Sequence, residues 1–410
     1  MREICNTSAC TGCMACANVC AHQAIIIKQD EEGFDRPVVD EDLCVDCGLC
    51  KQVCPINNHP ATSEPLNVYS GWSSDENVRL SSSSGGAFSE IARPILEDGG
   101  VVFGCSLDEK LQAVHTYVET MEDLAAKLRG SKYVQSRIGD SYSKAREFLK
   151  QGRKVLFSGT PCQIAGLRNY LRRDYDNLIT VDLICHGVPS PMIFEDYKKY
   201  IAESQKMTIT DVKFRCKKSS WIFYNMTVTG HVENHKAPKT YIGKYYEDPY
   251  IRGFLSDIFL RPSCHQCHYT SITRCSDFTI ADWWGYKMYK GDRRDFEQKG
   301  VSLVFCNTEK SKTLFSTRID NNFNSHIRTI EEAIMTNKCL KKPYAKSNNR
   351  DSFWEKYNKE GFVSVMQEYM HKVTPNLIVN IRYCLKPSLI RDIIIWVIYK
   401  FKGLSRRLHL

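Results

Sequence analysis

The stretch CTGCMACANVC, residues 10–20, carries four cysteines separated by two, two and three residues. The same spacing returns in CVDCGLCKQVC, residues 44–54. Three closely spaced cysteines followed by a fourth are typical of 4Fe-4S ligands, whereas a structural zinc site usually takes two cysteine pairs separated by a longer spacer. The sequence therefore predicts two 4Fe-4S clusters near the start of the chain.

In paired runs of this kind, the fourth cysteine of each run binds the cluster of the other run. The predicted ligands of cluster one are Cys10, Cys13, Cys16 and Cys54. The predicted ligands of cluster two are Cys44, Cys47, Cys50 and Cys20. This crossed ligation predicts a dicluster ferredoxin-like domain over residues 1–58, and the Pro-, Asn- and Ser-rich residues 59–67 that follow indicate a linker. Cys5 lies outside the pattern, and we interpret it as a bystander.

The composition is ordinary for a globular chain of more than one domain, with 410 residues, 42% hydrophobic and 25% charged. The start has no apolar run typical of a secretion signal, and no apolar segment reaches the roughly 20 residues that span a bilayer. We therefore expect a cytoplasmic protein. Its 19 cysteines are then better candidates for metal ligands or redox groups than for disulfides.

The net charge of +9 is concentrated at the end of the chain. Residues 381–410 hold a single acid, Asp392, and seven basic residues: Arg382, Lys386, Arg391, Lys400, Lys402, Arg406 and Arg407. This tail is either an amphipathic helix on an anionic membrane surface, which would make the protein membrane-peripheral, or a terminal helix packed on the body. Because the rest of the chain is nearly balanced and no DNA-binding helix pair is recognisable, we expect no nucleic-acid partner.

Apolar runs and helix-period segments alternate after the linker. The expected strands cover residues 99–105, 154–159 and 177–185, and the expected helices cover residues 120–130, 140–152, 163–173 and 192–204. Such alternation predicts an α+β or mixed α/β domain with a partly parallel sheet. We place this domain at residues 68–310, followed by a helical C-terminal extension over residues 311–410.

Two of the expected strand-to-helix turns share one design. Thr160 and Ser190 can each cap a helix whose first residue is proline, a position where the missing N–H is not needed. Cys162 then falls in a first helical turn and Cys185 at a strand end, so both lie at the carboxyl edge of the sheet, where open α/β folds bind ligands.

A third metal site is predicted from four scattered cysteines: Cys162, Cys185, Cys264 and Cys267. A third 4Fe-4S cluster is the interpretation we favour. The CxxC pair of this set is a weak signal alone, and it also suits a zinc site with His265 or His268. A redox-active thiol at Cys162 is the remaining alternative.

Five segments together carry a family resemblance: SSSSGGAFS (81–89), GSKYVQS (130–136), FSGTPCQIAGL (157–167), CHGVPSP (185–191) and SDFTIADWWG (276–285). These segments follow the predicted dicluster domain. Together with it, they resemble the family of coenzyme F420 hydrogenase/dehydrogenase beta subunits over roughly residues 1–310. The resemblance implies a flavin, usually FAD with FMN as the alternative, beside an iron–sulfur cluster. Family members act on a deazaflavin, on chlorophyll-pathway intermediates, or on unestablished substrates in bacterial surface-polysaccharide gene neighbourhoods. Cys275 stands where we expect an apolar residue in this family. It is either a spare thiol or an alternative ligand of the third site.

The candidate flavin-binding residues follow from these segments. Ser83, Ser84, Gly85 and Gly86 enter a helix at Ala87 and suit a pyrophosphate, unless this run is a flexible linker. Further candidates for cofactor binding are Lys132, Gln135, Gly159 and Thr160. For Lys132, the plainer interpretation is an exposed loop lysine.

Candidate catalytic residues are His186, Lys132 and Asp282. His186 could deliver a proton near the flavin at neutral pH, or be a structural histidine. Asp282, with Trp283 and Trp284, either lines the cofactor pocket or is a strand-end cap beside two core aromatics.

The combined prediction is an iron–sulfur, flavin-dependent oxidoreductase. Electrons would pass from ferredoxin or another redox protein through the clusters to the flavin, and then to a small organic acceptor. The alternative is a non-catalytic electron-transfer subunit that serves a partner enzyme.

Overall fold

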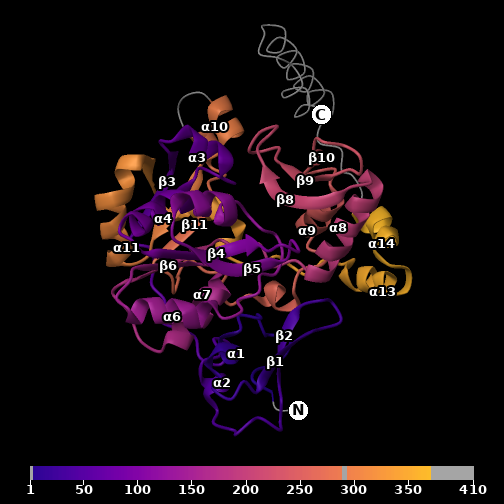
Figure 1. Ribbon diagram of the computed structural model, residues 1–410. Helices are drawn as coiled ribbons and strands as arrows, with labels where there is room; N and C mark the ends of the chain where they lie inside the picture. The colour runs from indigo at the N-terminus through magenta and orange to yellow at the C-terminus, as the bar shows by residue number, and fades with distance from the viewer. Residues whose placement is uncertain (1–2, 289–292, 371–410) are drawn as a thin grey trace, which may run out of the picture.

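The structure, a computed structural model, describes residues 3–288 and 293–370. The predicted basic tail, residues 381–410, lies outside the described residues. No helix in the described ranges is long and apolar enough to cross a bilayer. Figure 1 shows a small N-terminal module beneath a large sheet covered by helices, with a second, smaller sheet beside it.

An eight-stranded mixed sheet forms the centre of the molecule, in the order β13-β3-β12-β11-β7-β6-β4-β5. Its strands are β3 (Asn67–Ser73), β4 (Val101–Leu107), β5 (Ala113–Val118), β6 (Val155–Ser158), β7 (Leu178–Leu183), β11 (Phe278–Asp282), β12 (Ser302–Cys306) and β13 (Phe323–Arg328). Strands β4, β6, β7 and β11 pair in parallel, and the outer strands pair antiparallel. The mixed α/β class predicted from the sequence is confirmed.

Helices cover both faces of the parallel strands because alternate residues of a strand point to opposite sides. On one face, Phe103 and Phe157 pack with the helices α6 (Ser141–Lys150) and α7 (Pro161–Leu171). On the other face, Val102 and Leu156 pack with α4 (Ala87–Glu97) and the π-helical turn η1 (Leu124–Leu128). Burial on both faces explains why these strands read as continuous apolar runs.

The two strand-to-helix turns form as their sequences predict. Helix α7 begins at Pro161, and the side chains of Thr160 and Gln163 form a capping box. Helix α8 (Pro191–Gln205) likewise begins at its proline, and the Oγ of Ser190 accepts a hydrogen bond from the N–H of Ile193. Both turns lie at the carboxyl edge of the parallel strands.

A second core lies beside the large sheet and was not predicted. It is built from β8 (Thr208–Cys216), β9 (Asn225–His231), β10 (Lys239–Lys244), α8, α9 (Pro249–Leu255), α13 (Arg350–Glu360) and α14 (Phe362–Tyr369). The expected C-terminal extension is therefore split between two parts of the fold. Helices α13 and α14 join this second core, whereas β13 pairs with β3 and carries the large sheet past residue 310, where the sequence placed the domain boundary.

The N-terminal module packs directly on the large domain. Its elements are α1 (Ala15–Val19), β1 (Ile25–Gln29), β2 (Asp35–Val39) and α2 (Leu49–Gln52). Met14, Ala15 and Val53 share one buried cluster with residues of α6 and α7. The linker is also held, because Ser63 and Arg274 exchange two backbone hydrogen bonds of 2.9 Å. The module is therefore fixed against the domain that follows it.

The remaining helices and turns are α3 (Glu76–Ser81), α5 (Met121–Asp123), α10 (Arg293–Lys299), α11 (Glu309–Leu314), α12 (Ile330–Thr336), η2 (Pro262–Gln266), η3 (Tyr286–Met288), η4 (Phe315–Ile319), η5 (Asp320–Asn322) and η6 (Lys338–Leu340).

Candidate functional site

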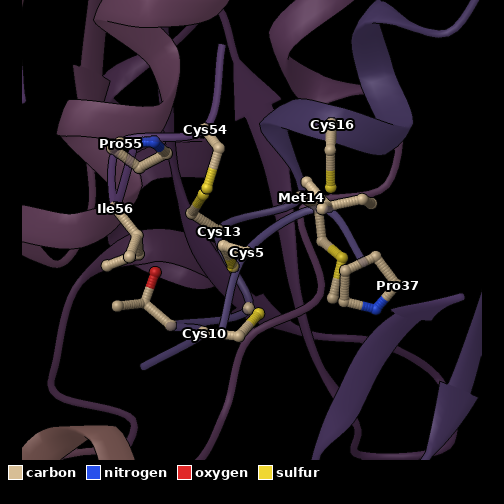
Figure 2. Close-up of a pocket in the computed structure, with 12 residues that line it drawn as sticks. Cys5, Cys10, Cys13, Met14, Cys16, Pro37, Cys54, Pro55 and Ile56 are labelled. Carbon is tan, nitrogen blue, oxygen red and sulfur yellow. The ribbon is translucent and has the colours of Figure 1, made fainter. Parts of the chain in front are cut away.

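One pocket in the N-terminal module gathers all four predicted ligands of cluster one (Figure 2). Its cysteines are Cys5, Cys10, Cys13, Cys16 and Cys54. Cys54 comes from the second cysteine run and the three predicted partners from the first, so the fold brings the two runs together as the crossed ligation requires.

Cys5, interpreted from the sequence as a bystander, lies inside this pocket. Cys5 shares hydrogen bonds with the thiols of Cys10 and Cys54, and these bonds together with burial raise the pKa of Cys5. Cys5 therefore contacts two predicted ligands of cluster one. Spacing alone cannot reveal Cys5, because chain folding brings it to the pocket.

The predicted ligands of cluster two are more accessible to solvent than those of cluster one, and none of them is buried. Cys44, Cys47 and Cys50 interact electrostatically, and Cys47 is exposed. Helix α1, which ends just before Cys20, packs against α2, which contains Cys50. This packing is consistent with Cys20 as the fourth ligand, and its assignment stays a prediction.

The four cysteines predicted for the third site also come together. Cys162 stands in the first turn of α7, Cys185 follows β7, and Cys264 and Cys267 lie on and just after η2. Cys162, Cys185 and Cys264 are half-buried, and each interacts electrostatically with other members of the set; burial raises the pKa of Cys264 to about 12. Cys264 Sγ also accepts a hydrogen bond of 3.4 Å from the N–H of Val188.

Buried polar groups without partners gather beside these sulfurs. Among the described residues, the Nε and Nη2 of Arg261 and the Oη of Tyr269 are buried and lack hydrogen-bond partners. Tyr269 lies near both Cys162 and Cys13, and the Thr11 hydroxyl lies within hydrogen-bonding reach of Cys162. An unpartnered buried donor costs about 1–3 kcal/mol, and the sulfurs of an iron–sulfur cluster accept hydrogen bonds. The residues present therefore fit a cluster at this site.

The zinc alternative finds less support in the side-chain geometry. Within residues 3–288 and 293–370, no three His, Cys, Asp or Glu side chains converge tightly enough to hold one metal ion. The four thiolates of a cubane bind four different irons and need not converge in this way. The two histidines considered as zinc ligands have other neighbours. His265 Nδ1 lies 3.1 Å from the carbonyl oxygen of Tyr344, and the ring centroid of His268 lies 5.4 Å from that of His59.

Cys275 lies apart from the four-thiol set. Burial raises its pKa to about 12, and its charged neighbours are Asp182, Arg168 and Arg274. This environment favours a spare thiol over an alternative ligand.

A cavity of about 770 Å³ opens beside the third site. A volume of this size is typical of cofactor pockets. Thr11 and Gly12, from the loop of the first cysteine run, form part of its wall, and Cys185 forms another part. The predicted positions of cluster one and the third cluster therefore border the same cavity.

The Ser/Gly run lies at one end of the cavity, where Ser83, Ser84 and Gly86 line the wall. Gly85 lies behind them: its N–H donates to Ser302 Oγ, and a β-carbon there would lie 2.4 Å from the carbonyl oxygen of Gly71. Substitution of Gly85 would therefore disturb the packing of β3 and β12 before it reached a ligand.

Arg129, which the sequence analysis missed, completes this end of the cavity. Its Nε donates to Ser89 Oγ in the first turn of α4, and its Nη1 donates to Ser81 Oγ. Burial lowers its pKa. A guanidinium beside the N–H groups of a helix N-terminus suits a phosphate group.

Lys132 and Gln135 both line the cavity, but each is also part of the framework. Lys132 Nζ donates to the carbonyl oxygens of Lys127, Leu128 and Arg129, at the end of η1, and burial lowers its pKa. Gln135 Oε1 accepts a hydrogen bond from the N–H of Asp35 in the N-terminal module. Gly159 and Thr160 also line the cavity, at the start of α7.

His186 and Asp282 line the cavity with defined partners. His186 Nε2 lies 2.6 Å from Asp257 Oδ1, and its ring stacks on Tyr344 at 3.8 Å between centroids. Asp282 pairs with the buried Arg215, and Oδ1 of Asp282 accepts a hydrogen bond from a tryptophan indole, that of Trp221.

The two tryptophans that follow Asp282 divide between the cavity and the core. Trp284 lines the cavity and is 41% exposed, whereas Trp283 is fully buried in a hydrophobic cluster.

His115 is a second cavity residue that the sequence did not single out. Because the carbonyl oxygen of Ser158 can only accept, the Nε2 of His115 donates to it at 3.1 Å, and the Nδ1 accepts from the hydroxyl of Ser136 at 2.7 Å. Burial lowers the pKa of His115 to about 4.

We expect His115 to stay neutral in the folded protein from pH 8 to pH 5. Since its folded-state pKa lies below the usual value of about 6.5, its contribution to stability is complete above about pH 6.5 and is lost as the pH falls toward about 4. The measurement is an NMR titration of histidines labelled at Cε1, with the His115 resonance assigned from its absence in His115→Asn. A His115 resonance that titrates near pH 6.5 would contradict the buried neutral ring.

Comparisons with known proteins agree with the two cysteine runs and with the family resemblance. A 4Fe-4S dicluster domain profile matches residues 9–58. Profiles of the coenzyme F420 hydrogenase/dehydrogenase beta subunit match residues 68–140 with the N-terminal part and residues 152–330 with the C-terminal part.

Several individual proteins are similar to this chain. A subunit of the F420H2 dehydrogenase of Methanosarcina mazei is 25% identical over 288 residues, which are 66% of this chain and 75% of that protein. The coenzyme F420-dependent sulfite reductase of Methanocaldococcus jannaschii is 31% identical over 199 residues, which are 46% of this chain and 29% of that protein. A chain of the F420-reducing NiFe hydrogenase complex from Methanosarcina barkeri is 18% identical with a TM-score of 0.43, covering 72% of this chain and 94% of that chain.

The two beta-subunit profiles together match more than half of the chain, and they extend past residue 310 to include β13. The dicluster profile matches the part of the chain that contains both N-terminal cysteine runs. The chain therefore belongs to the family of coenzyme F420 hydrogenase/dehydrogenase beta subunits and carries a 4Fe-4S dicluster domain before the family's own domains.

Proposed function

We propose that this chain is an iron–sulfur flavoprotein oxidoreductase. Electrons from ferredoxin or a similar redox protein pass through clusters two and one to the third cluster, and from there to a flavin in the large cavity. The observation that carries the proposal is the shared cavity wall, which includes both Thr11–Gly12 of the first cysteine run and Cys185 of the third site. Helix α7 links the two sites: Cys162 stands in its first turn, and a β-carbon on Gly166 would lie 3.0 Å from Cys13 Sγ.

A bound flavin, FAD by preference, would supply the exchange between one-electron cluster chemistry and two-electron hydride chemistry. The residues that would hold its phosphates are Ser83, Ser84, Gly86 and Arg129 at the N-terminus of α4. Gln135, Gly159 and Thr160 line the cavity nearer the cysteines and would contact the ring system.

His186 is the residue best placed to move a proton. Its Nε2 is held by Asp257, and this contact orients the ring in the cavity wall and favours a proton on Nε2. Asp282 is paired with Arg215, so its carboxylate serves to hold that buried guanidinium rather than to accept a proton. The organic acceptor, with polysaccharide precursors among the candidates, would bind beside these groups.

A second candidate function is electron delivery to a partner enzyme. The similar Methanosarcina mazei protein is one subunit of an F420H2 dehydrogenase, which favours this alternative. An isolated chain that reduces its own flavin with ferredoxin, yet turns over no small acceptor, would identify it as such a subunit.

Arg129→Gln is expected to weaken FAD binding by about tenfold to a hundredfold, because a hydrogen bond to a charged phosphate is worth about 1.5–3 kcal/mol. Riboflavin lacks phosphate, and its binding is expected to stay unchanged. Fluorescence titration of flavin-free protein with FAD and with riboflavin measures both affinities.

The matched control is Arg146→Gln, which removes an arginine that stacks on Tyr170 away from the cavity. This control should bind FAD like the unaltered protein. Equal loss of FAD and riboflavin affinity in Arg129→Gln would place the phosphates elsewhere.

A further inference from the structure

Arg261 is a buried cation that lacks a protein counter-ion in the described residues. Its side chain is 2% exposed, and neither its Nε nor its Nη2 has a hydrogen-bond partner. An ionised side chain that leaves water without a partner carries a large free-energy cost, and proteins normally pair it with an anion. This arrangement therefore indicates that an anionic group belongs beside Arg261.

Arg261 lies between two cysteine sites. A β-carbon on Gly12, in the loop of cluster one, would lie 2.9 Å from Arg261 Nη2. On the other side, the backbone N–H of Cys264 donates to the carbonyl oxygen of Arg261 at 2.9 Å. The centre of the guanidinium also lies 5.2 Å from the ring centroid of Phe34, so the N-terminal module packs over it.

The positive charge of Arg261 reaches the thiols on both sides. It interacts electrostatically with Cys10 on one side and with Cys162 and Cys264 on the other. Cys10 is a predicted ligand of cluster one, and the other two are predicted ligands of the third cluster.

A neighbouring arginine shows what is unusual about this one. Arg350 is also buried, at 5% exposure, and its Nη2 donates to the carbonyl oxygen of Leu260, the residue before Arg261. Arg350 forms a two-point ion pair with Glu32, so its charge is already compensated by the protein.

We propose that Arg261 is the shared counter-ion of cluster one and the third cluster. A 4Fe-4S cluster with four thiolates is anionic and gains one more negative charge on reduction, so a buried cation stabilises the reduced form and raises the reduction potential. One guanidinium between two clusters favours reduction of both and keeps their potentials close. The part that concerns the third cluster rests on the proposed function.

The test is a potentiometric titration of the anaerobic full-length protein, followed by EPR of the reduced clusters. Signals are assigned from their loss in the Cys264→Ser/Cys267→Ser variant for the third cluster and in Cys47→Ser for cluster two. Arg261→Gln is expected to lower the equilibrium constant for reducing cluster one and the third cluster by about tenfold, which is about 59 mV for one electron. Cluster two should not shift.

Two matched variants separate charge from packing. Arg261→Lys keeps the charge and should keep both potentials near those of the unaltered protein. The double variant Arg350→Gln/Glu32→Gln disturbs the same corner but removes an ion pair whose net charge is zero, so the cluster potentials should stay in place. Loss of iron from Arg261→Gln but not from Arg261→Lys would also support the proposal, because the charge would then be needed to hold the clusters.

Unchanged potentials in an iron-replete Arg261→Gln protein would overturn the proposal. Equal iron loss in Arg261→Gln and Arg261→Lys would overturn it too, since shape rather than charge would then matter. An unaltered protein with about eight irons instead of about twelve would show that the third cluster is absent. The iron count thus distinguishes an error in the proposed function, where the third cluster is absent, from an error in the role proposed for Arg261.

Discussion

Replacing Cys264 and Cys267 together with serine is expected to remove about four of about twelve irons from the anaerobically prepared protein, with a matching loss of acid-labile sulfide. The two thiols belong to one site with Cys162 and Cys185 and are not among the predicted ligands of the N-terminal runs. A cubane that loses two of its four ligands should not survive, whereas clusters one and two keep all of theirs. Colorimetric iron and sulfide assays against protein concentration measure the change.

Cys216→Ser is the matched control for this experiment. Cys216 ends β8 and lines neither the cluster-one pocket nor the large cavity. Its replacement should leave the iron count unaltered. If the double variant kept the full iron content as well, the third site would not be an iron–sulfur site.

Cys47→Ser is expected to remove about four irons as well, and to abolish reduction of the flavin by ferredoxin while leaving reduction by dithionite intact. Cys47 is the exposed member of the cluster-two set, and the nearby Leu43 and Val45 are 51% and 59% exposed. Cluster two is therefore the one that a protein donor can approach. Dithionite is small enough to reach the cavity directly.

The control for this second effect is again Cys216→Ser, which should be reduced by both donors at the rates of the unaltered protein. Retained ferredoxin-driven reduction in an iron-depleted Cys47→Ser protein would mean that the donor docks elsewhere.

Local features of the sequence predicted much of the site. The two cysteine runs predict their own chemistry because three of the four ligands of each cubane come from a single run at fixed spacing. The turns at Thr160 and Ser190 were predictable for a similar reason, since the cap and the proline act within one helical turn. Together they placed Cys162 and Cys185 at the sheet edge before any long-range contact was known.

The features that could not be predicted from the sequence depend on packing between residues far apart in the chain. Cys5 enters the cluster-one pocket through the fold of its own module, and Arg261 meets Gly12 only because that module docks on the larger domain. Strand β13 pairs with β3, which lies some 250 residues earlier in the chain, so no local sequence pattern predicts this pairing. Arg261 does stand three residues before Cys264, but without the fold nothing marks it as buried and unpaired.

We propose that electrons reach the large cavity through the third cluster. The most direct test is anaerobic rapid mixing that follows flavin absorbance after addition of reduced ferredoxin or dithionite, in the unaltered protein and in Cys264→Ser/Cys267→Ser. We expect the variant, loaded with the same amount of flavin, to lose ferredoxin-driven reduction and to keep dithionite-driven reduction. Equal ferredoxin-driven rates in the two proteins would contradict the proposal.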